Sequence, residues 1–290
     1  MEPSKDWRRL RLIHESDEHD RAVWSVGYYD KCGVTSYAAA KILRPETPLT
    51  AEVAHFEGQV MQAVREAQQP FLVELLDCWT EPEQFCLAMP LYPATLMDYF
   101  VWRRYLPDPS RDMLCAAEIV EGLSFLHSLG IIHMDVKPDN VMIDEQGHVV
   151  LCDFGLSMYI RGPDDDQKTL SCGTDGYIAP ELMEQREGAY SLPADIWSLG
   201  VTLLELALKE DEYYFERTVS LETIRVEVDS DAFVCGIRDA DLRDLLRKTI
   251  VLSPTARMTI WDIRDHPYFA PIHWDVLRNK GYPRMFDALL

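Results

Sequence analysis

The residue pattern of the chain changes near position 90, and this change restricts the folds that it can adopt. Before it, short runs rich in β-branched, aromatic and aliphatic residues predict five strands, over Trp7–Ile13, Ala22–Tyr29, Ser36–Leu43, Leu72–Trp79 and Gln84–Met89. One helix is predicted between the third and fourth strands, over Thr50–Gln68, with Thr50 as its N-cap. The first part therefore reads as a five-stranded sheet with one helix.

After Pro90 and Pro93 the apolar residues mostly recur at helical spacing. Helices are predicted over Arg111–Ser128, Ala194–Lys209, Ala240–Thr249 and Thr259–Asp265. Gly130 follows the first of these as a residue suited to end a helix. We therefore expect an α+β fold of two lobes, with a β-rich lobe over 1–90 and an α-rich lobe over 91–290.

The charge of the chain excludes some classes of partner. Lys and Arg number 28 against 49 Asp and Glu, which gives a net charge of −21. General nucleic-acid and anionic-membrane binders need positive surface, so neither is expected, whereas basic substrates would suit this chain. No signal peptide or transmembrane segment is predicted, so we expect a soluble, cytoplasmic protein, or a secreted one if a targeting segment was trimmed. The sequence makes no prediction about oligomeric state.

Acidic, basic and amide side chains are closely spaced in His133-Met134-Asp135-Val136-Lys137-Pro138-Asp139-Asn140. Asp153-Phe154-Gly155 follows, and then Ala179-Pro180-Glu181. Carboxylate and amide oxygens suit Mg²⁺, and a nearby carboxylate and ammonium group suit proton and phosphoryl handling. This pattern indicates a site for a metal-bound nucleotide.

These three motifs, in this order and spacing, resemble the catalytic loop, metal-binding triplet and activation-segment end of eukaryotic protein kinases. The resemblance implies a bilobal kinase fold and a Ser/Thr protein kinase that uses ATP and Mg²⁺ on a protein substrate. Within it, Asp135 accepts the proton of the substrate hydroxyl or orients that hydroxyl, and Lys137 reaches the transferred phosphoryl group. Asn140 and Asp153 are the implied metal ligands.

The resemblance also implies a nucleotide-binding set. Ala38-Ala39-Ala40-Lys41 is similar to the kinase strand whose lysine holds the α- and β-phosphates. Glu57 is the expected partner of this lysine, with Glu52 as a weaker rival. The adenine would lie between Ala39 and Met142, beside Met89 at the gatekeeper position and Tyr92 at the hinge.

Three further residue roles follow from the resemblance and are architectural. Thr174, in Cys172-Gly173-Thr174-Asp175-Gly176, is expected to hydrogen-bond the catalytic Asp and Lys. Asp195 is expected to hold the backbone of the catalytic loop. Glu181 is expected to form a buried ion pair with Arg257.

The chain departs from the kinase pattern where a glycine-rich loop normally covers the phosphates. The segment His14-Glu15-Ser16-Asp17-Glu18-His19-Asp20-Arg21 contains no glycine and four carboxylates. Side chains keep the backbone away from phosphate oxygens, and carboxylates repel them. Either the protein is a pseudokinase scaffold that acts by binding partners, or ATP is held by Lys41 and the metal ions, with the loop swung aside. The latter pattern is similar to the with-no-Gly-loop kinases secreted by some intracellular parasites.

Two details of the alignment to kinases bear on function. Either Val23 or Val26 could be the valine that packs on adenine. Met134 stands where most regulated kinases have an arginine that receives an activation-loop phosphate. We therefore expect that activity does not depend on phosphorylation of Thr169 or Ser171.

Overall fold

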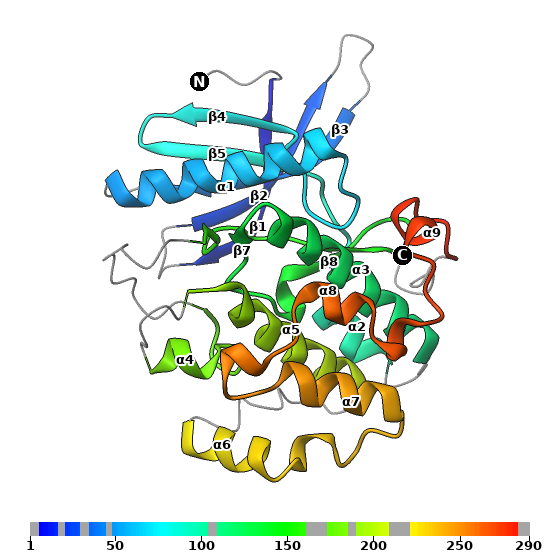
Figure 1. Ribbon diagram of the computed structural model, residues 1–290. Helices are drawn as coiled ribbons and strands as arrows, with labels where there is room; N and C mark the ends of the chain where they lie inside the picture. The colour runs from blue at the N-terminus through cyan, green and yellow to red at the C-terminus, as the bar shows by residue number, and fades with distance from the viewer. Residues whose placement is uncertain are drawn as a thin grey trace. The chain divides into compact units, whose positions relative to one another are not determined.

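A computed structural model describes residues 6–16, 21–29, 35–44, 48–103, 109–160, 173–184, 190–208 and 221–283 (Figure 1). The chain divides into two compact units, at Pro93/Ala94, and the short segment Asp153–Gly155 belongs to the first of them. The first is rich in strands and the second in helices, which confirms the expected α+β class.

The first unit is built on an antiparallel sheet of five strands in the order β1-β2-β3-β5-β4. Its elements are β1 (Arg8–Ser16), β2 (Arg21–Tyr29), β3 (Thr35–Leu43), α1 (Pro48–Ala67), β4 (Asp77–Glu81) and β5 (Gln84–Met89). Helix α1 lies against the sheet, because a Cβ placed on Gly58 would be 3.2 Å from the Leu87 side chain of β5. The predicted sheet with one helix is therefore confirmed.

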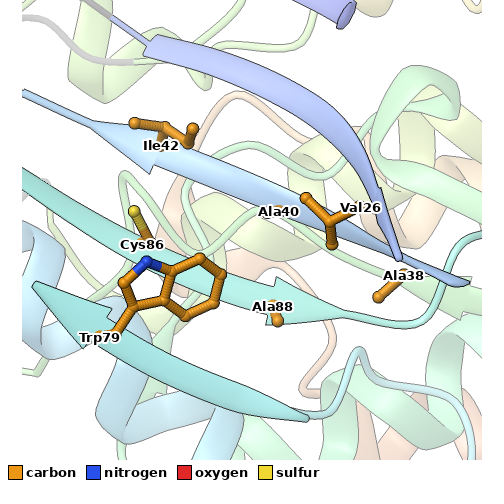
Figure 2. Close-up of a cluster of buried hydrophobic side chains, with 7 residues drawn as sticks. All are labelled: Val26, Ala38, Ala40, Ile42, Trp79, Cys86 and Ala88. Atoms are coloured by element: carbon orange, nitrogen blue, oxygen red, sulfur yellow. The ribbon is translucent and has the colours of Figure 1, made fainter. Parts of the chain in front are cut away.

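The two faces of this sheet have different roles, and the strand register separates them. Ala38, Ala40 and Ile42 alternate with Ala39 and Lys41 along β3, so the two sets lie on opposite faces. On one face a cluster of buried side chains joins four strands (Figure 2): Val26, Ala38, Ala40, Ile42, Trp79, Cys86 and Ala88. We call the opposite face, which carries Ala39 and Lys41, the Lys41 face.

Two local predictions in the first unit are wrong. The strand expected over Leu72–Trp79 is β4, which begins only at Asp77; Leu72, Val73 and Leu75 are instead buried in a connection from α1. There the Leu75 amide donates to the Met61 carbonyl at 3.3 Å, and this bond ties the connection to the helix. Helix α1 begins at Pro48, so Thr50 lies inside the first turn and is not its N-cap.

The second unit contains eight α-helices among its described residues, with short strands and 3₁₀ turns between them. They are α2 (Leu96–Arg103), α3 (Pro109–Ser128), α4 (Pro180–Met183), α5 (Leu192–Ala207), α6 (Leu221–Asp229), α7 (Ala240–Thr249), α8 (Ile260–Arg264) and α9 (Trp274–Arg278). The strands are β6 (Ala94–Thr95), β7 (Ile131–Ile132), β8 (Val141–Ile143), β9 (Val149–Leu151) and β10 (Met158–Tyr159). The 3₁₀ turns are η1 (Pro138–Asn140), η2 (Ala232–Val234), η3 (Pro254–Ala256) and η4 (Pro267–Phe269).

Helices α3 and α5 form the centre of this unit. Both are buried along much of their length, and α3 contacts β7, β9, α5 and α8. Gly130 follows α3 with a φ of 69°, which confirms its predicted place at the helix end. Strands β8 and β9 pair antiparallel, and β8 also pairs with β6, so these three strands form a small sheet. The segment 133–140 leads directly into β8. No described helix combines the length and apolar character needed to cross a bilayer.

Candidate active site

Lys41 forms a buried charged group with two carboxylates in the first unit. Its Nζ lies 2.7 Å from Oε1 of Glu57 on α1 and 2.6 Å from Oδ1 of Asp153. Lys41 is 6% exposed and Glu57 2% exposed, so this charge is held away from bulk water. The expected pair between Lys41 and Glu57 is thus present, whereas the rival Glu52 is exposed to solvent.

Asp153 has a backbone conformation that is uncommon for a residue other than glycine. Its φ is 65°, in the left-handed region. The Gly155 amide donates to Oδ1 of Asp153 at 3.1 Å, beside the contact from Lys41. Such a conformation persists where surrounding bonds fix it, and it is concentrated at functional sites.

The register of the sheet decides which valine shares a face with Lys41. Val23 pairs with Lys41 across β2 and β3, and directly opposed residues point to the same face. Val26 pairs instead with Ala38 and is buried in the cluster of the other face (Figure 2). Of the two candidates left open by the sequence, Val23 is the one on the Lys41 face.

The residues predicted to surround adenine lie in both units. Ala39 pairs with Met89 across β3 and β5, and Ala39 is buried while Met89 is half-buried. Tyr92 is half-buried at the end of the first unit, and Met142 is half-buried on β8 of the second. Their roles around adenine stay predictions.

The catalytic-loop residues form one hydrogen-bonded group in the second unit. Thr174 Oγ1 donates to Oδ1 of Asp135 at 2.7 Å, and Lys137 Nζ lies 2.9 Å from Oδ2 of the same carboxylate. Lys137 also donates to Thr174 Oγ1. The predicted contacts of Thr174 with both charged residues are therefore confirmed, and they fix the carboxylate of Asp135 in one orientation.

Asn140 completes this group and shows which of its atoms can bind a metal. Its Nδ2 donates to the backbone oxygen of Asp135 at 2.8 Å and to Oδ2 of Asp135 at 2.7 Å. Both amide hydrogens are thereby used, which leaves Oδ1 of Asn140 as an acceptor. Amide and carboxylate oxygens are donors of the kind that Mg²⁺ prefers, so the chemistry of Asn140 in the second unit and of the partly exposed Asp153 in the first, each by itself, fits the metal implied by the resemblance.

Asp195, at the start of α5, holds the backbone before Asp135. Its Oδ2 accepts from the His133 amide at 2.8 Å, and its Oδ1 accepts from the Met134 amide at 2.8 Å. The predicted role of Asp195 is confirmed. The sequence analysis missed His127, whose Nε2 lies 2.9 Å from Oδ2 of Asp195. Met134 itself has a φ of 72° and is buried.

A second missed pair anchors the β8–β9 hairpin. Buried Glu118 on α3 accepts from the Val149 amide at 2.8 Å and lies 2.7 Å from Nδ1 of His148. Burial raises the pKa of the Glu118 carboxyl, and its contact with His148 opposes this shift. Because β9 ends at Leu151, this pair fixes the strand that leads to Asp153.

The expected ion pair of Glu181 and Arg257 is also present and buried. Arg257 Nη1 and Nη2 donate to the two oxygens of Glu181 at 2.5 and 2.7 Å. Nη1 also donates to the Pro193 carbonyl at 2.9 Å, at the start of α5. This bidentate pair therefore ties the segment after Thr174 to the helix that carries Asp195.

The β-rich unit carries the Lys41 group, and the helical unit carries the Asp135 group. These two units and their groups are the ones that a protein kinase domain contains. A profile of the protein kinase domain matches residues 31–269. The chain belongs to the protein kinase family.

Its curated relatives include proteins named serine/threonine-protein kinase and protein kinase C. It is 32% identical over 249 residues to serine/threonine-protein kinase YPK1 of Saccharomyces cerevisiae, covering 85% of this chain and 36% of the relative. It is 29% identical over 261 residues to human serine/threonine-protein kinase Sgk2, covering 87% and 69%, respectively. Human protein kinase C delta type is 31% identical over 254 residues, covering 86% of this chain and 36% of that protein. The chain thus spans about a third of several relatives and carries a eukaryotic-type kinase domain.

Proposed function

We propose that the protein is a Mg-ATP-dependent Ser/Thr protein kinase with an atypical, glycine-free and acidic nucleotide loop. The observation that carries this proposal is the connected group of Asp135, Lys137, Thr174 and Asn140, in which every side chain is held by another. In this proposal residues 1–90 form the nucleotide-holding lobe and residues 91–290 the substrate lobe. The partner is a protein that presents a serine or threonine hydroxyl.

The residues of this chain have separate tasks in phosphoryl transfer. Asp135 orients the substrate hydroxyl and accepts its proton, because Thr174 and Asn140 fix its carboxylate. Lys137 contacts the transferred phosphoryl group, and Lys41 holds the α- and β-phosphates. Mg²⁺, held by Asn140 and Asp153, would neutralise charge on the phosphates. Positioning and charge stabilisation supply most of the rate in such reactions.

A second candidate is a pseudokinase scaffold that acts by binding a partner. It is favoured by one observation, the lack of glycine in His14–Arg21. The first candidate is favoured because Lys41, Asp135, Lys137, Asn140 and Asp153 are all retained. The two candidates predict different responses to Mg-ATP.

The test is transfer of radiolabelled phosphate from ATP to a generic basic protein, with Asp135→Asn beside the unaltered chain. We expect that Asp135→Asn lowers the transfer rate at least about 100-fold. Glu145→Gln, which removes an exposed carboxylate in the β8–β9 turn, serves as the control and should transfer at the normal rate. Absence of transfer, with no thermal shift on adding Mg-ATP, would reject the enzyme in favour of the scaffold.

A further inference from the structure

The register of β1 places Arg11 and His14 on the Lys41 face. His14 pairs with Val23, which pairs with Lys41, so these three residues form one row across the sheet. In the neighbouring row, Arg11 pairs with Ser25, which pairs with Ala39. Directly paired residues point to the same face. Arg11 and His14 therefore lie on the face that carries the proposed nucleotide-binding lysine.

Two irregularities in β1 produce this placement. The register shifts between Arg9 and Arg11 and again between Leu12 and His14. Each shift adds one residue to β1, so regular alternation is interrupted at Leu10 and Ile13. Arg9 and Leu12 consequently pair with residues of the opposite face, Val26 and Trp24. Without the second shift, His14 would lie on the opposite face of the sheet from Arg11.

Arg11 and His14 are close enough to Lys41 to act on the same ligand. Neighbouring strands lie about 4.8 Å apart, so the backbone of His14 is about 10 Å from that of Lys41. Successive residues on one face are about 7 Å apart along a strand, which places Arg11 one row further on. The side chains of Lys41 and Arg11 are long, and a polyphosphate between the rows can meet both.

These two residues differ from their neighbours in having no internal partner. Arg8 pairs with Asp6, and Arg9 donates to Glu81 and Gln84. Arg11 and His14 are exposed, and the side chain of neither forms a hydrogen bond or ion pair with any residue of the described part of the chain. An arginine side chain with no carboxylate partner, in a chain with a net charge of −21, is available to bind an anion.

We infer that Arg11 and His14 bind the phosphates of the nucleotide from the β1 side, in place of the backbone amides of a glycine-rich loop. This inference rests on the proposed function, since it assumes that Lys41 holds the same nucleotide. A loop of bulky residues cannot bring its N–H groups close to phosphate oxygens. Side chains reach further than backbone groups, so the guanidinium of Arg11 and the imidazole N–H of His14 on the preceding strand can supply the missing donors.

The test measures the binding of Mg-ATP and of adenosine to the full chain by calorimetric titration. The variants are Arg11→Gln, His14→Gln and the double substitution, which remove the guanidinium and the imidazole from exposed positions and leave the core unchanged. Arg8→Gln is the matched control: it removes the same charge from the same strand and face. Arg8 shares a row with Gly27 and Tyr37. This row lies two rows, or about 14 Å, along the strands from the row of Lys41.

We expect the double variant to raise the Kd for Mg-ATP about 10- to 30-fold, as for the loss of two hydrogen-bonded contacts to phosphate. The Kd for adenosine, which has no phosphate, should stay within about twofold. Arg8→Gln should match the unaltered chain, and Arg11→Lys with His14→Lys should restore most of the affinity.

An unchanged Kd for Mg-ATP in the double variant overturns the inference, as does an equal loss for adenosine. If the unaltered chain binds and transfers phosphate while the double variant does so equally well, only this inference fails. If the unaltered chain neither binds Mg-ATP nor transfers phosphate, the proposed function fails with it.

Discussion

The catalytic loop and the Lys41 face of the sheet hold their polar groups in opposite ways. In the loop, the Asp135 carboxylate contacts Thr174, Lys137 and Asn140, and Asp195 holds the preceding backbone. On the Lys41 face, Lys41 is held by Glu57 and Asp153, but the side chains of Arg11 and His14 form no hydrogen bond or ion pair with any described residue. The loop is organised before any ligand arrives, which reduces the reorganisation needed during the reaction. In the proposed function, the sheet face instead depends on its ligand for completion.

The largest effect is expected from Lys41→Met, which removes the cation that Glu57 and Asp153 share. Phosphate transfer should fall about 100-fold or more, because the phosphates lose a preorganised charge. Folding should weaken by about 1–3 kcal/mol, since buried Glu57 loses a charged partner. Steady-state transfer assays and urea unfolding measure the two effects. Lys248→Met, at an exposed Lys248–Asp244 pair, is the control and should change neither. A transfer rate close to normal in Lys41→Met would show that another group holds the nucleotide.

A smaller effect is expected from Asp195→Asn, which tests whether the loop is preorganised. The substitution keeps one oxygen where two accept from the His133 and Met134 amides. We expect kcat to fall about 10- to 100-fold and stability to fall by about 1–3 kcal/mol, because a buried amide loses its acceptor. The Kd for Mg-ATP, measured by titration, should remain within about twofold. A normal kcat would mean that the loop keeps its geometry without these bonds.

Local motifs explain which parts could be predicted from the sequence. Asp135, Lys137 and Asn140 lie within six consecutive residues, and their geometry follows from one short loop. The ion pair of Glu181 and Arg257 is 76 residues apart, yet it was expected because both ends lie in recognisable motifs. The strands and α1 follow from apolar periodicity.

The features that were missed depend on tertiary packing or on backbone irregularity. His127 and Asp195 are 68 residues apart, and neither the spacing nor the type of His127 indicates their contact. Glutamate usually lies at the surface, but Glu118 on α3 is buried because its carboxylate pairs with His148 of the β8–β9 hairpin. The two register shifts in β1 follow from no residue pattern, so the face of His14 could only be read from the strand pairing.

A modest effect is expected from the acidic loop, which lies outside the described residues at Asp17 and Glu18. Replacing both by glycine should tighten Mg-ATP binding about two- to fivefold if the loop approaches the phosphates, because like charge is removed and the backbone is freed. Asp17→Asn with Glu18→Gln separates these causes, since it removes the charge alone. Michaelis constants for ATP measure the effect. An unchanged constant in both variants would show that the loop stays away from the phosphates, and it would leave Arg11 and His14 as the relevant groups.

The smallest effect concerns the activation segment, and it follows from the surroundings of Met134. This buried apolar side chain stands where an arginine would bind an activation-loop phosphate. The Met134 backbone is fixed through Asp195, and its carbonyl would lie 3.3 Å from a Cβ on Gly173. Gly173, at the start of the described segment after residue 172, thus lies close to the backbone of the loop. No phosphate is needed for these contacts.

We therefore expect Thr169→Ala with Ser171→Ala, at positions outside the described residues, to leave kcat/KM within about twofold of normal, because the loop geometry depends on Asp195 and Thr174. Thr174→Ala is the matched comparison: it removes a hydroxyl that contacts both Asp135 and Lys137 and should lower kcat about tenfold or more. Transfer assays on protein made without kinase or phosphatase treatment measure all three. Loss of most activity in the double variant would show that a phosphate in the activation segment organises the catalytic loop. The catalytic loop would then depend on an added phosphate group, just as the Lys41 face in the proposed function depends on its nucleotide.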